Sequence, residues 1–321
     1  MTQKLRGRTA TASLFVTLGL LLAACSGSGV DQAATEDSAA TTAECGAWGI
    51  AMHPWVGYTA TANVITEVAK KELGCEITQS QLDEAGVTYD AMEAGTVDVI
   101  VEDWGGGRWQ EWVDRGAIKE VGPNGQEGLI GMYVPKWMAD EYPDITDSAN
   151  LNKYADLFKT ADSGGKGAWY EGPPGYTTIG EKMIEANKLN FKAINTGSEA
   201  ALIDLFTDGQ KNKKAVLGYW YTPQYFNAQV ELARINFPAN DWADAAQASG
   251  LTDYPATPLI KLATTKLMES GSPFATLIQN FQWSNEDQNG VAADIEGGMD
   301  PAAAAQKWID ANPDKVKAWL G

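Results

Sequence analysis

Four short segments place aromatic side chains beside glycine or proline. Such positions lie at turns, where a side chain is more often exposed than packed in the core. They are residues 53–58 (HPWVGY), 102–108 (EDWGGGR), 169–176 (WYEGPPGY) and 219–223 (YWYTP). Several converging aromatic faces hold a cation that is too bulky and too poor in donors for hydrogen bonds, such as a trimethylammonium group. The pattern therefore favours a binding site for a small quaternary-ammonium solute.

Residue types that carry catalysis are scarce in this chain. The only histidine is His53, which we interpret as a loop histidine with its hydrogen bonds satisfied. The sequence contains no Gly-x-Ser-x-Gly elbow, Walker loop or Cys/His metal spacing, so we expect no catalytic residue, no metal and no cofactor. An enzyme that uses only carboxylates stays as an alternative, because 42 acidic residues make some facing pair inevitable.

The charge of the chain excludes another class of partner. The formal net charge is −18, and three of the cations lie in the first eight residues. No basic patch is left to hold phosphates, so nucleic acid is not an expected partner. In so acidic a chain, Glu102, Asp103 and Glu171 are interpreted as solvated carboxylates, although they could face an ammonium group.

The remaining sequence indicates an α/β protein of two lobes, each a mostly parallel sheet flanked by helices, with a hinge between them. Strands at 47–51, 74–78 and 97–101 alternate with helices near 64–73 and 89–95. Residues 129–135 form a plausible crossing strand, and 178–189 and 215–220 supply a helix and a strand of the second lobe. We expect lobe I over 44–130, lobe II over 131–235, and a helical return to lobe I over 236–321.

Two aromatic segments directly follow predicted strands, those at 97–101 and 215–220. The carboxyl ends of strands are where ligands bind in open α/β sheets, so a shared cleft is geometrically reasonable. The alternative for every aromatic residue is packing in the core. We interpret six further tryptophans as core residues, namely Trp109, Trp112, Trp220, Trp242, Trp308 and Trp319.

Motifs in order along the chain resemble the glycine betaine, carnitine and choline substrate-binding proteins of ABC importers. An "ALxxGxxD" segment is matched by residues 90–98 (DAMEAGTVD), and Trp104 follows shortly after it. A Pro-Gly-aromatic turn is matched by 174–176, and an aromatic-Thr-Pro motif by 221–223. The resemblance implies a type II periplasmic-binding-protein fold that closes on its ligand by a hinge.

The resemblance also implies site residues and partners. Trp104, Tyr176 and Tyr221 would wall the cation, and Trp55 matches an aromatic residue of the choline-type branch. The implied ligand is glycine betaine or proline betaine, or else carnitine or choline, and the implied partners are ABC permease subunits. We expect a monomer. A receptor for another small osmolyte or an amino acid is the alternative within the class of solute receptors.

Arg108 follows Trp104 across three glycines, a flexible turn that allows its side chain to reach the same cleft. A guanidinium cannot favour a trimethylammonium, so its predicted role is to bind a carboxylate at the other end of the ligand. Backbone N–H groups near Thr177 and Thr178, ahead of a predicted helix, would add donors. The alternative is that Arg108 lies on the surface and offsets acidic neighbours.

The N-terminal segment has the pattern of an export signal. Cationic residues precede an apolar run that ends in Leu22-Ala23-Ala24-Cys25, which resembles the lipobox of bacterial lipoproteins. We expect a signal peptide over 1–24, a lipidated Cys25 and a disordered tether over 25–43, hence an extracytoplasmic protein anchored to the membrane. Once Cys25 is lipidated, Cys45 and Cys75 remain as a pair in an oxidising compartment, which predicts a disulfide between them. The alternatives are an unlipidated secretory signal and two buried thiols.

Overall fold

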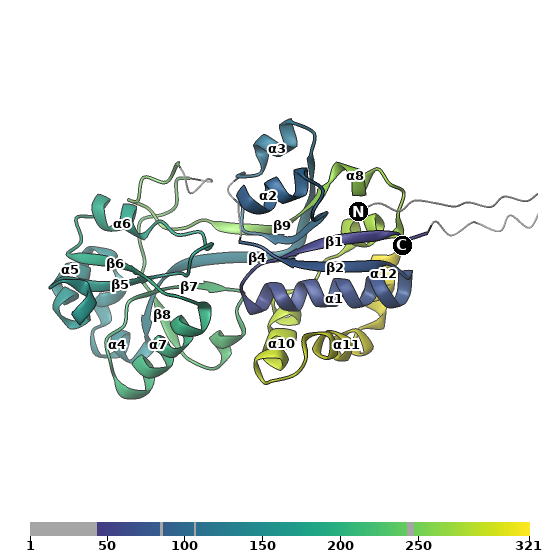
Figure 1. The fold of residues 1–321 in the computed structure, drawn as a ribbon. Coiled ribbons are helices and arrows are strands. Elements are labelled where there is room, and N and C mark those ends of the chain that lie inside the picture. The colour runs from purple at the N-terminus through teal and green to yellow at the C-terminus, as the bar shows by residue number, and fades with distance from the viewer. Residues whose placement is uncertain (1–43, 84–85, 106, 243–246) are drawn as a thin grey trace, which may run out of the picture. The chain divides into compact units, whose positions relative to one another are not determined.

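The computed structural model describes residues 44–83, 86–105, 107–242 and 247–321 of the 321-residue chain. The predicted signal peptide, tether and lipidated Cys25 lie outside these residues. Within them, nine strands form one mixed sheet (Figure 1). The strand order is β2-β1-β3-β9-β4-β7-β5-β6, with β8 paired to β4.

One end of the sheet is built from the first strands of the chain, β1 (Ala47–Met52), β2 (Glu76–Gln81) and β3 (Val99–Asp103). β1 pairs in parallel with β2 and β3, and the connections are α1 (Val56–Leu73) and α2 (Gly86–Glu93). α1 ends at Gly74, whose φ of 67° is the left-handed conformation that glycine adopts without steric cost. The predicted alternation of strands and helices is confirmed here.

The other end of the sheet is built from β5 (Gly167–Glu171), β6 (Phe191–Asn195) and β7 (Gly218–Thr222). β5 pairs in parallel with both of the others, and α6 (Gly180–Ala186) and α7 (Glu199–Asn212) connect them. The chain reaches β5 through short helices, which are α4 (Lys136–Glu141), η1 (Pro143–Thr146), η2 (Ser148–Asn150), α5 (Leu151–Tyr154), η3 (Ala155–Phe158) and η4 (Ala161–Ser163). η5 (Tyr225–Ala228) and β8 (Leu232–Arg234) follow β7.

Two antiparallel strands join the ends of the sheet. β4 (Ile118–Pro135) follows the short α3 (Gln110–Asp114) and pairs with β9 (Ala256–Thr264), then with β7, then with β8. β9 also pairs with β3. The predicted crossing strand at 129–135 is thus the last part of a longer strand, and β9 is a second crossing strand in a region that we expected to be helical. The lobe boundaries given above stay a prediction.

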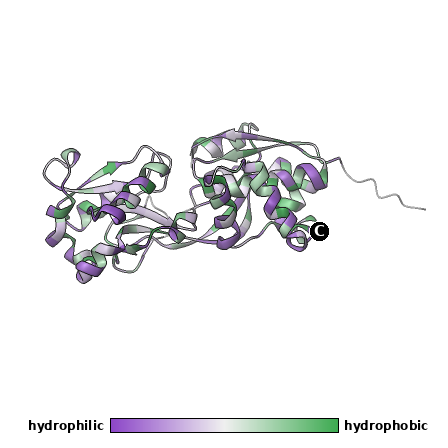
Figure 2. Ribbon diagram, turned by 90° about the horizontal axis from the view of Figure 1, so that it is seen from below, coloured by the Kyte–Doolittle hydropathy of each residue, from purple (hydrophilic) through white to green (hydrophobic). Residues whose placement is uncertain are grey.

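Helices that follow β9 cover the first end of the sheet. α1 packs against α9, α10 and α11, and α12 packs against α9. These helices carry hydrophilic and hydrophobic residues on the same segment, as expected of elements with one face in the core (Figure 2). Their bounds are α8 (Thr265–Met268), α9 (Pro273–Asn280), α10 (Asn285–Glu296), α11 (Pro301–Ala311) and α12 (Pro313–Leu320). In the described part of the chain, no helix combines the length and hydropathy needed to cross a membrane.

A disulfide joins Cys45, which precedes β1, to Cys75, which precedes β2. Their Cα atoms are 4.8 Å apart, within the range that a disulfide spans. Because β1 and β2 are parallel neighbours, the bond ties their amino-terminal ends together.

Candidate ligand-binding site

The aromatic residues singled out in the sequence lie at or just beyond the carboxyl ends of strands. Trp55 follows β1 as the N-cap residue of α1, and Trp104 directly follows β3. Tyr176 lies in the connection between β5 and α6, and Tyr221 lies near the end of β7. All four residues therefore come from the ends of strands or from the segments that follow them.

All four of these rings line one cavity. The structure thus brings together residues that are up to 166 positions apart in the sequence, from Trp55 to Tyr221. The other lining residues are Ile130, Thr177 and Tyr219. Tyr219 was missed as a wall in the sequence, although it is two residues from Tyr221 in the same strand and alternate residues share a face. Trp220, between them, is fully buried, as predicted for a core residue.

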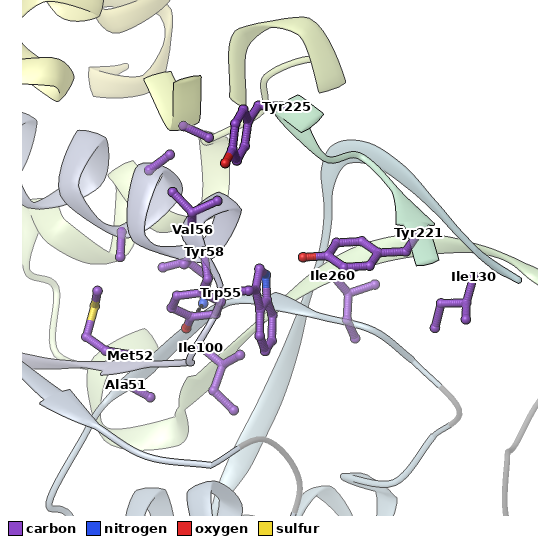
Figure 3. Close-up of a cluster of buried hydrophobic side chains, with 14 of the residues drawn as sticks. Ala51, Met52, Trp55, Val56, Tyr58, Ile100, Ile130, Tyr221, Tyr225 and Ile260 are labelled. Atoms are coloured by element: carbon purple, nitrogen blue, oxygen red, sulfur yellow. Dashed lines mark hydrogen bonds between the residues drawn. The ribbon is translucent and has the colours of Figure 1, made fainter. Parts of the chain in front are cut away.

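The rings meet edge to face around this cavity. Trp104 and Tyr221 have centroids 5.3 Å apart at 89°, and Trp55 and Tyr176 have centroids 5.6 Å apart at 78°. Tyr176 and Tyr221 complete the set at 6.0 Å and 77°. Figure 3 shows Tyr221 extending from its strand with Trp55 and Ile130 beside it. Perpendicular rings face in different directions, so the cavity has aromatic walls on several sides. We call Trp55, Trp104, Tyr176, Tyr219 and Tyr221 the aromatic cage.

Behind the cage, Glu102 holds both indoles by their polar edges. Its Oε1 accepts hydrogen bonds from Trp55 Nε1 at 3.0 Å and Trp104 Nε1 at 2.8 Å. Its Oε2 accepts from Thr61 Oγ1 at 3.3 Å and from Gln288 Nε2. Burial raises the pKa of Glu102, and these hydrogen bonds oppose that rise.

Glu199, at the start of α7, holds Tyr221 in the same way. Its Oε1 accepts hydrogen bonds from the Tyr221 hydroxyl and from Gln224 Nε2, the latter at 2.7 Å. Its Oε2 accepts from the backbone N–H of Val56 at 3.2 Å, beside Trp55. Burial raises the pKa of Glu199 as well. No motif marked Glu199, because it lies far along the chain from Val56.

The interpretation of Glu102, Asp103 and Glu171 as solvated carboxylates is wrong. All three are buried, with at most 2% of the residue exposed. Asp103 accepts hydrogen bonds from Tyr89 Oη at 2.6 Å and from the N–H of Gly105, and Glu171 accepts from Trp169 Nε1 at 2.6 Å. These donors supply part of the compensation that a buried carboxyl group requires.

The residues predicted to bind a carboxylate line a second cavity, which adjoins the aromatic cage. Arg108, Thr177 and Thr178 all line it, and Tyr176 and Thr177 line both cavities. The Arg108 side chain is 21% exposed, its Nε donates to Gly105 O at 3.2 Å, and its Nη2 is 4.0 Å from Asp103 Oδ1. The buried Thr177 hydroxyl has no hydrogen-bond partner among the described residues.

The position of Trp104 depends on Gly128 of β4. A Cβ atom on Gly128 would lie 2.5 Å from Trp104 Cζ3 and 2.8 Å from Leu259 Cδ2. Gly128→Ala should therefore displace the Trp104 ring and weaken ligand binding, and it should destabilise the fold by about 1 to 3 kcal/mol, the usual cost of overpacking. Gly290→Ala is the matched control, because a Cβ there meets no atom within 4 Å. Calorimetric titration of both variants checks this, and equal affinities would contradict it.

Comparison with known proteins places this chain in a family. The family model for the substrate-binding domain of the ABC-type glycine betaine transport system (OpuAC) matches residues 49–311. The chain belongs to this family. The match confirms the resemblance drawn from the motifs, and it supports a solute-binding protein over an enzyme.

Among curated proteins, this OpuAC-family chain is similar to the glycine betaine/carnitine transport binding protein GbuC of Listeria monocytogenes. The two are 28% identical over 127 residues, which make up 39% of this chain and 38% of GbuC. The alignment thus spans about two fifths of the relative's length.

Solved structures of similar proteins agree in fold. The lactococcal OpuAC in complex with glycine betaine has a TM-score of 0.67 at 19% identity, covering 86% of this chain and 99% of the other. An ABC-transporter choline-binding protein in complex with choline gives 0.69 at 20% identity, covering 86% and 92%. ProX from Borrelia burgdorferi gives 0.68 at 16% identity, covering 86% and 97%. At these identities the likeness concerns the fold, which is the predicted two-lobed type II periplasmic-binding-protein fold.

Proposed function

We propose that this protein is the extracytoplasmic solute receptor of an ABC importer and that it binds a quaternary-ammonium compatible solute in the aromatic cage. The observation that carries the proposal is the cavity lined by Trp55, Trp104, Tyr176, Tyr219 and Tyr221. Aromatic faces attract a cation by about 0.5 to 2 kcal/mol each when water is excluded. A primary ammonium would instead require several acceptors at the same place.

The polar cavity beside the cage supports a zwitterionic ligand. Arg108 carries the charge for a carboxylate, and the unpartnered Thr177 hydroxyl is a donor at the boundary between the two cavities. Glycine betaine and proline betaine have a cationic head and a carboxylate, so they are the ligands that we favour. Carnitine has both groups at greater separation, and choline has no carboxylate. The receptor would deliver its solute to the permease subunits, as a monomer held to the membrane by lipid on Cys25.

Equilibrium titration of the purified protein tests the proposal. Glycine betaine, proline betaine, carnitine, choline, ectoine and proline should be titrated in parallel, with tryptophan fluorescence as a readout because Trp55 and Trp104 line the site. We expect the betaines to bind most tightly. Binding of proline or ectoine without any betaine would favour the alternative, a receptor for another osmolyte or an amino acid.

Mass spectrometry of the exported protein tests lipidation of Cys25, and an unmodified N-terminus upstream of it would contradict the anchor.

The assignment of Arg108 makes a separate prediction. Arg108→Ala should weaken glycine betaine binding by about 1.5 to 3 kcal/mol, as for a lost charge-assisted hydrogen bond, and leave choline binding almost unchanged. Arg115→Ala is the control, because Arg115 pairs with Glu93 and Glu111 at the surface. Equal losses for both ligands would mean that Arg108 supports the loop instead of binding the carboxylate.

A further inference from the structure

Glu102 and Glu199 lie behind the aromatic cage and do not line its cavity. Glu102 is fully buried at the end of β3, and Glu199 is 8% exposed at the start of α7. Between them they accept hydrogen bonds from three of the five cage rings, which are Trp55, Trp104 and Tyr221. Both carboxylates thus bind the polar edges of rings that line the cavity.

The surroundings of each carboxyl group match its ionised form. Glu102 accepts from two indole N–H groups, a hydroxyl and an amide, and Glu199 accepts from a hydroxyl, an amide and a backbone N–H. A carboxylate is an acceptor only, whereas a protonated carboxyl must also donate. Hydrogen bonds to the charged form favour it over the neutral form.

These contacts act on the faces of the rings as well as on their positions. An aromatic ring has a negative face and a positive edge, and its attraction for a cation comes from that distribution. When an N–H or O–H at the edge donates to an anion, the hydrogen bond polarises the ring and shifts electron density towards the face. In the protein interior the negative charge itself also attracts a cation across the ring, because the effective dielectric constant is far below that of water.

We propose that Glu102 and Glu199 are the buried counter-anions of the aromatic cage. Each fixes cage rings by their polar edges and makes their faces more negative, so that the site selects a permanently positive head group over an uncharged group of the same shape. The two are positioning and specificity-determining residues, since they reach the ligand only through the rings. This inference rests on the proposed function and adds to it the reason why a cation is preferred.

Ligand pairs that differ only in charge test the proposal. Replacing the quaternary nitrogen by carbon converts glycine betaine to 3,3-dimethylbutanoate and choline to 3,3-dimethylbutan-1-ol. The affinity of each pair is measured by calorimetry and ligand-observed NMR for the native protein, Glu102→Gln and Glu199→Gln. Gln preserves the shape and one acceptor oxygen. We expect each variant to reduce the preference for the cation by about tenfold or more, the scale of a charge acting over several Å in the protein interior.

The matched control is Asp98→Asn. Asp98 directly precedes β3 and is also a buried carboxylate. It accepts hydrogen bonds from the Gly49 N–H and the Thr264 hydroxyl, which are not part of the cage. Its substitution should leave the cation preference unchanged. Circular dichroism and unfolding curves establish that each variant is folded, and Glu199→Gln provides a second variant in a different part of the sheet if Glu102→Gln does not fold.

The outcomes separate this inference from the proposed function. If the native protein binds no quaternary ammonium compound, the proposed function fails. If the native protein binds the cations but each variant loses equal affinity for charged and neutral partners, the carboxylates only hold the rings and the counter-anion role is overturned. A native protein that binds the neutral analogues as tightly as the cations would overturn it as well.

Discussion

Trp104→Ala and Tyr221→Ala should each weaken the binding of glycine betaine by about 1 to 3 kcal/mol, which is about 5- to 150-fold in Kd. Both rings line the cavity, and they stand at 89° to each other. Each substitution therefore removes a different wall of the cavity. Phe at either position should retain more affinity than Ala, because it preserves a ring face. Isothermal titration calorimetry with the betaine gives the values directly.

Trp112→Ala is the control for these variants. Trp112 is a half-buried tryptophan of the short α3, bound to Asp90 and packed on Tyr89, and it belongs to neither cavity. Its removal should affect stability and leave ligand affinity unchanged. If both cage variants fold and bind with native affinity, the ligand does not occupy this cavity.

The walls of the cage could be predicted because the signal was local. An aromatic residue beside glycine or proline is visible within ten residues, and this pattern marked the four segments. The resemblance to the family then pointed to Trp55, Trp104, Tyr176 and Tyr221 within them. The supports of those walls could not be predicted, since they depend on tertiary contacts. Glu102 was seen next to Trp104 and interpreted as solvated, because nothing in the sequence reveals that Gln288 of α10 lies beside it.

The crossing strand β9 shows a second limit of the sequence. Its segment contains Pro258 near the start and Lys261 in the middle, and both residues are typical of edge strands or surfaces. Lys261 is instead 1% exposed, and its Nζ donates to the carbonyl oxygens of Gln279 and Phe281. The C-terminal end of α9 therefore supplies acceptors for a buried cation. This compensation is formed only in the folded protein.

Glu171 makes the unfolding free energy depend on pH in an unusual direction. The residue is 2% exposed, and its Oε2 has no hydrogen-bond partner among the described residues. Burial raises the pKa of Glu171 from 4.5 to about 7, with a smaller contribution from Glu181. Between these two values the native protein holds a proton that the unfolded chain has released. The contribution of Glu171 to stability is therefore lost as the pH rises through this window, and it stays lost above pH 7.

Glu171→Gln isolates this effect, because glutamine resembles the protonated carboxyl and does not titrate. The variant should gain stability relative to the native protein as the pH rises from 4.5 to 7, reaching a plateau of roughly 3 kcal/mol, since each unit of pKa difference is worth about 1.4 kcal/mol. His53 adds a slope of the opposite sign below pH 6.5, because burial lowers its pKa from 6.5 to about 3 in the native protein, but this contribution is present in both proteins and cancels in their difference. Glu102, Asp103 and Glu199 have raised pKa values too, but their contributions are present in both proteins and cancel.

Urea unfolding of the native protein and the variant between pH 4.5 and 8.5 measures this difference. Glu185→Gln is the matched control, an exposed carboxylate of α6 whose removal should leave the pH profile close to the native one. A constant offset between Glu171→Gln and the native protein at every pH would mean that Glu171 is ionised in the fold throughout. The cavity beside the cage would then hold a permanent negative charge next to Arg108, and a ligand carboxylate would have to bind against it.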